Sequence, residues 1–186
     1  KLLRLSAFIV SLFFIILISI SFPHTKERMI DNTISDFGLG IKDKIFIFSD
    51  GHQQLYSSAI KMFSDNPITG VGPKIFRTLC DTKNYSVDAC STHPHNTYVQ
   101  LLAETGIIGF LFISILFFLV TKELFLQFFK MYIFKTKKNL ISTPQLCILC
   151  ALTISLWPFI PTGNFFNNWI NVYYYFPLGF YLYLRD

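Results

Sequence analysis

The stretch Thr92-His93-Pro94-His95-Asn96 precedes an apolar run over residues 97–120 that contains Gly106 and Gly109. The run has the length of a membrane-spanning helix, which needs about 20 apolar residues. If stretch and run form one helix, His95, Gly106 and Gly109 fall on one face at 3.6 residues per turn. Glycines on that face would admit a second helix at close range. The sequence therefore predicts a histidine held at a membrane surface by a packed helix pair.

The residues around His95 indicate what this position can do. Pro94 suits the first turn of a helix, with Thr92 or His93 near the N-cap. His95 would then lie in that first turn, where unpaired amides and the helix dipole favour anions and disfavour a charged imidazole. A neutral histidine can accept a proton. We interpret His95 as a candidate base beside a site that can hold an anionic leaving group.

The composition predicts a membrane protein, since 52% of the 186 residues are hydrophobic, 22 are Phe and 15% are charged. We expect an all-α polytopic membrane protein with about four transmembrane helices and one large extracytoplasmic loop that contains short helices. The transmembrane helices are predicted at residues 1–22, 98–120, 143–160 and 168–186, the last including the C-terminus. They leave a loop at 23–97, a basic connection at 121–142 and a short turn at 161–167. The chain starts without Met and almost at a span, so we expect it to be the C-terminal part of a larger protein.

Lysines predict the orientation. The 121–142 connection carries Lys122, Lys130, Lys135, Lys137 and Lys138 against Glu123 alone. By the positive-inside rule this connection is cytoplasmic, so the 23–97 loop and the 161–167 turn are periplasmic. The net charge of +5 comes largely from this connection. It predicts contact with membrane lipid and does not indicate a nucleic-acid partner.

The periplasmic loop is expected to be folded. In residues 53–64 the apolar positions Leu55, Ala59, Met62 and Phe63 recur at helical spacing, which predicts an amphipathic helix. A tight glycine turn at 68–73 should follow, with Pro73 opening a short helix. In an oxidising compartment, Cys80 and Cys90 are expected to form a disulfide, although two free thiols are the alternative.

These motifs resemble the O-antigen ligase and polymerase superfamily. The resemblance lies in Asp65-Asn66-Pro67-Ile68-Thr69-Gly70-Val71-Gly72-Pro73 and in His95-Asn96, nine residues, Gly106, two residues and Gly109. It covers residues 51–112. The first motif is shared by ligases, polymerases and protein O-oligosaccharyltransferases, whereas the histidine signature with its loop position is typical of ligases.

The resemblance implies transfer of a glycan from undecaprenyl pyrophosphate to a sugar hydroxyl of the lipid A–core, without cofactor or metal. It implies His95 as the base or positioning group, with Asn96 and His93 as candidate substrate-binding residues. Family members use arginines for the pyrophosphate, one of them in a Gly-Arg context where this chain has Gly51-His52. Arg77 is our first candidate for that role; the alternatives are His52, Arg28, Lys44 and residues upstream of this chain.

Several other interpretations remain open at this point. For His93 and His95 the alternatives are metal ligands and polar residues at a helix cap. Glu104, on the opposite helix face from His95, is either a functional intramembrane group or the partner of a polar group on a neighbouring span. A polymerase and a protein O-oligosaccharyltransferase of the same superfamily are the alternative enzymes. A non-enzymatic part of a lipid or polysaccharide exporter would share the topology.

Overall fold

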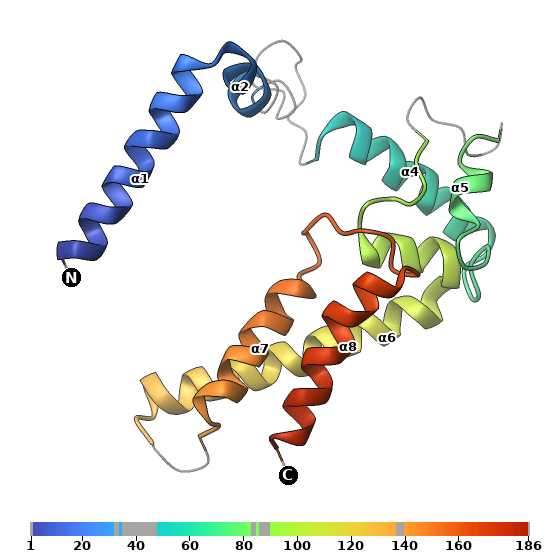
Figure 1. Cartoon of the computed structure of the whole chain (residues 1–186). Helices are drawn as coiled ribbons and strands as arrows, with labels where there is room; N and C mark the ends of the chain where they lie inside the picture. Colours follow the sequence, from blue (N-terminus) through green and yellow to red (C-terminus); the bar gives the residue numbers. More distant parts are fainter. Residues whose placement is uncertain are drawn as a thin grey trace. The chain divides into compact units, whose positions relative to one another are not determined.

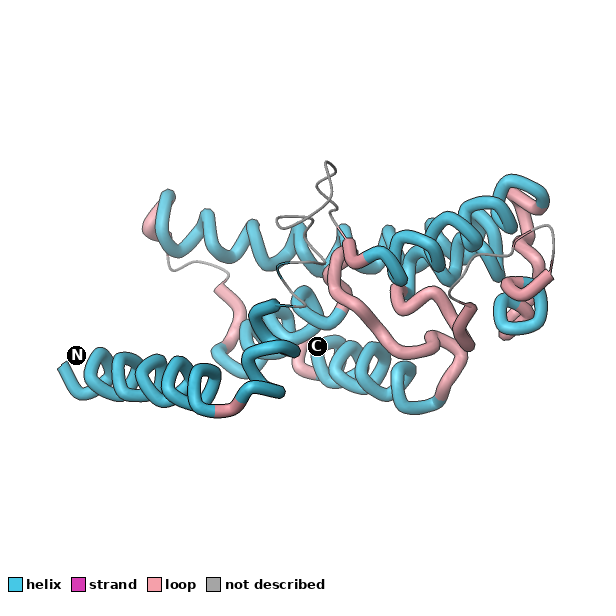
Figure 2. Tube along the Cα trace, turned by 90° about the horizontal axis from the view of Figure 1, so that it is seen from above, coloured by secondary structure: helices cyan, strands magenta, loops and turns pink. Residues whose placement is uncertain are grey.

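The computed structural model shows a helical protein and describes residues 2–31, 34, 48–82, 85, 90–136 and 140–185. Within these ranges all regular elements are helices and no strand occurs (Figure 2). The predicted all-α fold is therefore confirmed for the part of the chain that the structure describes. The chain divides into two compact units, residues 1–53 (unit 1) and 54–186 (unit 2).

Unit 1 is dominated by α1, Leu2–Ser21, which carries no charge from Leu5 onward. Phe8, Phe13 and Ile20 each leave more than half of their surface exposed within the unit. A helix that is apolar on all sides requires lipid or protein around it. Pro23 then opens the short α2, Pro23–Lys26, because proline suits the first helical position. A π-helical turn, η1 (Glu27–Asp31), follows directly.

Unit 2 contains three helices that lie side by side (Figure 1). They are α6 (Thr97–Phe128), α7 (Thr143–Ser155) and α8 (Asn168–Tyr183), and α6 continues into the π-helical turn η2 (Phe129–Ile133). Apolar side chains from all three helices and from the α7–α8 connection form one core cluster. Its buried members are Tyr98, Leu101, Ile113, Val120, Leu149, Leu152, Leu156, Phe165, Tyr174 and Tyr181.

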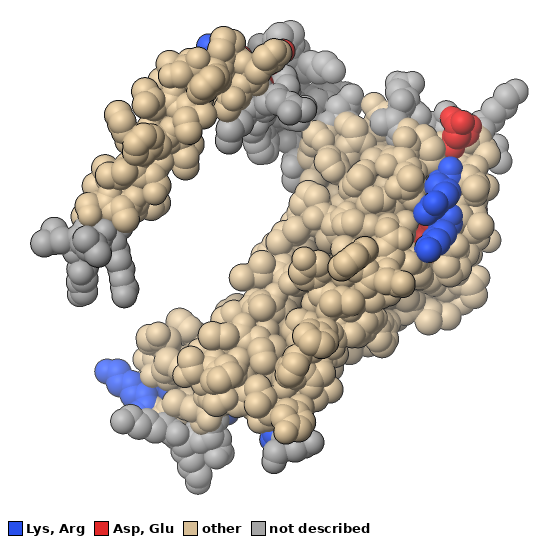
Figure 3. All heavy atoms as spheres, in the orientation of Figure 1, with Lys and Arg blue, Asp and Glu red and all other residues tan. Residues whose placement is uncertain are grey.

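One described helix, Thr97–Ile133, is long and apolar enough to cross a membrane, whereas the apolar helices Leu5–Ser21 and Thr143–Ser155 are shorter. On the face drawn in Figure 3, charged side chains of unit 2 lie near its two ends and none lies along the middle of the helices. The helix predicted over 143–160 ends at Ser155. The reason is local: a residue that precedes proline disfavours helical backbone, and both Pro158 and Pro161 follow.

The predicted amphipathic loop helix is confirmed as α4, Asp50–Asp65. Its residues Leu55, Ala59 and Met62 are buried, and they pack in one cluster with Phe76, Cys80 and Ala103. The apolar face of α4 therefore covers the short helix α5, Phe76–Leu79, and the start of α6. The prediction that Pro73 opens this short helix is wrong, because residues 73 and 74 form a turn and α5 starts at Phe76.

Helix α6 is broken at Gly106, whose backbone (φ 64°, ψ −158°) lies outside the helical region. In an unbroken helix the N–H of Ile107 would bond to the carbonyl of Ala103. Here that N–H donates to the carbonyl of Pro67 instead, across 2.9 Å. The Ala103 carbonyl accepts from the N–H of Val71, also across 2.9 Å. The glycine turn and the preceding Pro67 thus take over hydrogen bonds that the helix has given up.

Two glycines make this docking possible. A Cβ on Gly106 would lie 2.3 Å from the carbonyl oxygen of Ile68, and a Cβ on Gly70 would lie 2.4 Å from the carbonyl carbon of Glu104. Both residues have positive φ, 67° at Gly70 and 64° at Gly106. The expectation that the α6 glycines admit a second helix is therefore wrong. Gly106 admits the backbone of the glycine turn, and the space beside Gly109 is filled by the side chain of Thr105.

Candidate functional site

Helix α6 starts one residue after Asn96, which is its N-cap. The Asn96 side-chain oxygen accepts from the N–H groups of Tyr98 and Val99, at 3.0 and 3.1 Å. Its amide nitrogen donates to the carbonyl of Pro158, across 2.7 Å. Asparagine is among the strongest N-cap residues, because its short side chain reaches amides left unpaired in the first turn. Asn96 therefore has a structural role here that joins the start of α6 to the α7–α8 connection, residues 156–167.

His95 lies outside the helix, with a left-handed backbone of φ 57°. The predicted position of His95 in the first helical turn, on one face with Gly106 and Gly109, is therefore wrong. The backbone of His95 is fixed by the N–H of Thr162, which donates to its carbonyl oxygen across 2.9 Å. Its ring is partly buried, and Nε2 lies 3.1 Å from the hydroxyl of Ser91.

His93 lies against His95, with ring centroids 4.2 Å apart. It is buried, with Nε2 3.2 Å from the carbonyl of Thr162 and Nδ1 3.0 Å from the hydroxyl of Thr92. Because a carbonyl can only accept, Nε2 carries a proton and Nδ1 accepts from Thr92. Burial lowers the pKa of His93, as do the charges of His95 and Arg77, while the bond to Thr162 acts in the opposite direction. This arrangement suits a neutral His93.

Arg77 extends from α5 as an exposed side chain, and its charge acts on the buried His93. A disulfide between Cys80 and Cys90 links the end of α5 to the histidine segment, residues 90–95. The two Cα atoms are 5.6 Å apart. That Cα separation is typical of a disulfide. The structure therefore places Arg77 and the two histidines in one neighbourhood of unit 2.

Glu104 is fully buried on the loop side of the break in α6. Its Oε1 accepts from the N–H of Phe76 across 2.9 Å, and its Oε2 accepts from Gln100 Nε2 across 2.8 Å. Gln100 in turn contacts Asn164 and Phe165 in the α7–α8 connection. The sequence analysis assumed one straight helix from His95 through Glu104. In the structure His95 lies outside α6, and α6 is broken at Gly106. The partners of Glu104 are the loop and its own helix, not a neighbouring span.

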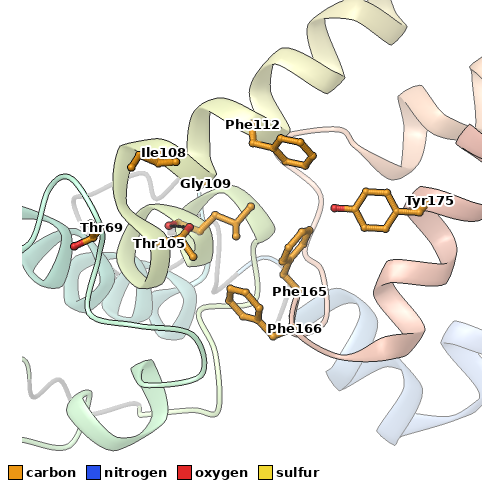
Figure 4. Close-up of a pocket in the computed structure, with 9 residues that line it drawn as sticks. Thr69, Thr105, Ile108, Gly109, Phe112, Phe165, Phe166 and Tyr175 are labelled. Carbon is orange, nitrogen blue, oxygen red and sulfur yellow. Dashed lines mark hydrogen bonds between the residues drawn. The ribbon is translucent and has the colours of Figure 1, made fainter.

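An apolar pocket of about 460 Å³ opens beside the break in α6. In Figure 4 the rings of Phe112, Phe165 and Tyr175 point toward one another from α6, the α7–α8 connection and α8. Thr105 and Gly109 line the pocket on the side of α6. A pocket with these walls accepts hydrocarbon rather than a polar group.

The alternative candidates for the pyrophosphate contact lie in unit 1 or outside the described part of the chain. His52 belongs to unit 1, where its Nδ1 lies 2.7 Å from the hydroxyl of Ser49. Lys44 and the side chain of Arg28 lie outside the described residues. In the part of the chain that the structure describes, no group of three His, Cys, Asp or Glu residues is placed to hold a metal ion around His93 and His95.

Four contacts of the histidines and of Glu104 were not predicted from the sequence. They are Ser91, Gln100, Thr162 and Asn164. Three of them contact residues more than sixty positions away in the chain. No local pattern marks such pairs. Ser91 lies only four residues before His95, and a hydroxyl at this spacing was a usable signal.

A family model described as O-antigen ligase matches residues 1–114, more than half of the chain. The matched range includes α1, the loop elements, the histidines, Glu104 and both α6 glycines. No curated protein and no solved structure matches the chain.

Proposed function

Because this chain belongs to the O-antigen ligase family, we propose that it transfers a glycan from undecaprenyl pyrophosphate to a sugar hydroxyl of the lipid A–core. The observation that carries the proposal is the position of His95. Its backbone is held in a left-handed conformation by Thr162, and its ring lies beside that of His93, whose pKa the charge of Arg77 lowers. A base and a cation thus lie in one neighbourhood, as transfer from a pyrophosphate requires.

The proposed step is a single displacement. The acceptor hydroxyl attacks the anomeric carbon of the glycan, the bond from that carbon to the pyrophosphate oxygen breaks, and the hydroxyl proton passes to His95. The hydroxyl of Ser91, 3.1 Å from Nε2, supports this assignment, because it shows that a hydroxyl fits at hydrogen-bond distance from this nitrogen. We propose that the acceptor hydroxyl takes the place of Ser91 there.

Arg77 is the proposed partner of the leaving pyrophosphate. A guanidinium is permanently charged and can bind two phosphate oxygens in parallel, which stabilises the charge that develops as the bond breaks. The Cys80–Cys90 disulfide supports this role, because it limits the movement of α5 relative to the histidine segment. In this scheme the charge of the leaving group is stabilised by protein cations without a metal ion.

We further propose that the chain crosses the inner membrane four times, with the 23–97 loop in the periplasm. The apolar length of α6 supports one crossing, and the lysines of the 121–142 connection support the orientation. The apolar pocket beside Gly109 and Phe112 is suited to isoprenoid units of the carrier. The catalytic residues then lie where the α6 break meets the periplasmic loop.

The test is a transfer assay with the whole protein in detergent or vesicles and purified undecaprenyl-pyrophosphate glycan as donor. Two acceptors are offered in parallel, lipid A–core and a second carrier-linked repeat unit. Transfer to lipid A–core supports the ligase. Transfer only to a second carrier-linked repeat unit identifies a polymerase, and transfer to neither excludes both activities. Each arm is repeated with EDTA. Loss of transfer with EDTA would contradict the metal-free scheme and would return His93 and His95 to the role of candidate ligands.

A further inference from the structure

Glu104 is a fully buried carboxylate whose two oxygens are both engaged by the protein. One accepts from the Phe76 backbone, 28 residues earlier in the chain, and the other accepts from Gln100 on the preceding turn of α6. A buried charge is retained only where donors satisfy it. Because the Glu104 side chain is fully buried, we infer that it acts through its partners and not by contact with a substrate.

The first partner leads to Arg77. Phe76 is the first residue of α5, and its N–H is one of the amides that a helix start leaves without an internal partner. Glu104 Oε1 accepts from this N–H across 2.9 Å. The contact therefore fixes the residue next to Arg77 to the start of α6, on a helix of a single turn that has little rigidity of its own.

The second partner leads to His95. Gln100 Nε2 also donates to Asn164 Oδ1 across 2.9 Å, and Gln100 Oε1 accepts from the N–H of Phe165 across 2.8 Å. Asn164 lies two residues after Thr162, whose N–H holds the carbonyl of His95. One continuous chain of hydrogen bonds and short backbone steps thus runs from the neighbour of Arg77 to the residue that fixes His95.

We propose that Glu104 is a positioning residue that sets the Arg77 guanidinium relative to the His95 ring. The inference rests on the proposed function, which assigns Arg77 to the leaving pyrophosphate and His95 to the acceptor hydroxyl. Displacement of either group by about 1 Å can cost on the order of 10²-fold in rate, because the two ends of a displacement must be in line. Glu104 is thus expected to act on turnover although it contacts neither substrate.

The chemistry of the contact suggests a sharp variant, Glu104→Gln, which keeps size and shape. A glutamine presents one oxygen and one NH₂ group, so in either orientation it turns a donor toward a donor, at Phe76 or at Gln100. The exchange variant Gln100→Glu with Glu104→Gln restores the pairing. In that variant the residue-104 oxygen accepts from Phe76, its NH₂ group donates to the new carboxylate, and the carboxylate accepts from Phe165. The exchange loses the donation to Asn164 Oδ1 and turns a carboxylate oxygen toward it, but Asn164 Nδ2, buried without a hydrogen-bond partner among the described residues, can donate to that oxygen if the amide turns.

The chain offers a matched control. Glu123, farther along α6, accepts from Gln127 Nε2 across 2.7 Å with the same spacing of four residues. Glu123→Gln alters an equivalent pair away from the histidines. We expect Glu104→Gln to lower kcat about 10²-fold and to weaken inhibition by inorganic pyrophosphate, whereas Glu123→Gln stays near wild type. The exchange variant is expected to recover most of the lost turnover.

The assay uses the whole protein with purified lipid-linked donor, and the Cys80–Cys90 bond and membrane yield report folding. Wild-type kcat and pyrophosphate inhibition in Glu104→Gln would overturn the proposal, as would an exchange variant that folds but recovers nothing. If Glu104→Gln does not accumulate, Glu104→Asp is measured instead. The aspartate side chain keeps the charge but is shorter, so α5 must move inward to keep the bond from Phe76. Unchanged turnover in Glu104→Asp would then overturn the proposal. If His95→Ala and Arg77→Lys also transfer normally, the proposed function itself is wrong.

Discussion

The amide of Thr162 donates to the carbonyl oxygen of His95 across 2.9 Å, although the two residues lie on opposite sides of α6 and α7 in the sequence. The same Thr162 accepts from the His93 ring through its own carbonyl. The α7–α8 connection thus holds the histidine segment by its backbone. The ring of His95 can be removed without loss of these two bonds, so its chemical role can be tested apart from its structural one.

We expect His95→Ala to abolish glycan transfer while the protein still enters the membrane, because the base is lost and the backbone contacts remain. Lipopolysaccharide gels of complemented ligase-null cells measure this. His24→Ala is the control, since the His24 side chain is fully exposed in unit 1. Ser91→Ala should retain most activity, because the acceptor hydroxyl is proposed to replace Ser91. A full ladder from His95→Ala would refute the assignment.

His93 gives a pH dependence of stability. Burial, His95 and Arg77 lower its pKa below the ordinary value of 6.5, so the unfolded chain takes up this proton at a higher pH than the folded protein. Between the two pKa values the unfolded state holds more protons, and stability falls as the pH drops through that window. We expect the thermal midpoint of the detergent-solubilised protein to decrease below about pH 6.5, and less steeply in His93→Gln. An unchanged slope in His93→Gln would show that another group is responsible.

Gly106→Ala should be strongly destabilising. The Gly106 backbone lies in a region that is almost restricted to glycine, which costs other residues about 1–3 kcal/mol. The added Cβ would also lie 2.3 Å from the carbonyl oxygen of Ile68. Gly179→Ala is the matched control on α8, where a Cβ meets nothing within 4 Å. Membrane yield and thermal midpoint should fall in the first variant only; equal values in both would mean that the break is not required.

The disulfide predicts a specific labelling pattern. Alkylation without reductant, followed by mass spectrometry, should find Cys80 and Cys90 linked, while Cys147 and Cys150 remain thiols, as they are in the structure. Quantitative alkylation of the first pair would exclude the bond. We expect loss of the disulfide to lower transfer more than abundance, because α5 and Arg77 would then move more freely relative to the histidines.

Arg77→Lys should lose most activity although it keeps the charge, because an ammonium cannot reproduce the planar contact with two phosphate oxygens. His52→Arg, which introduces the residue commoner in the family, should be tolerated. Transfer from the purified donor measures both variants, and Lys74→Gln is a nearby control that removes a charge without changing α5. A near-normal rate for Arg77→Lys would place the pyrophosphate contact on another basic group.

Periodicity in the sequence predicted the elements whose hydrogen bonds and packing are local. Leu55, Ala59 and Met62 defined α4, since a helix repeats every 3.6 residues regardless of its partners. The start of α6 was misplaced although its signal was present. Asn96 is a stronger N-cap than His93, and had it been chosen, His95 would have been placed before the helix.

The break at Gly106 could not be predicted from the run that contains it, because residues 97–120 are mostly apolar, carry a single charge and favour one helix. The break depends on hydrogen bonds supplied by residues 67–72, and such partners are a property of the folded protein. The same holds for the contact of Glu104 with the Phe76 amide, 28 residues earlier, whereas Gln100 lies four residues before Glu104 on the same helix, at a spacing open to sequence reasoning. The sequence marked Glu104 as a candidate polar group inside an apolar run. It did not show that the Glu104 side chain points toward the loop.

The broken helix also bears on how the protein reaches its working form. With the glycine turn undocked, the carbonyls of Ala103 and Glu104 and the N–H of Ile107 would lack partners, and in hydrocarbon each such group costs several kcal/mol. In the proposed membrane topology, a newly inserted α6 would therefore be more stable as a straight helix until the loop has folded against it. In that order of events the break at Gly106 forms only after the loop has folded, and a protein whose loop has not folded would be inserted, abundant and inactive.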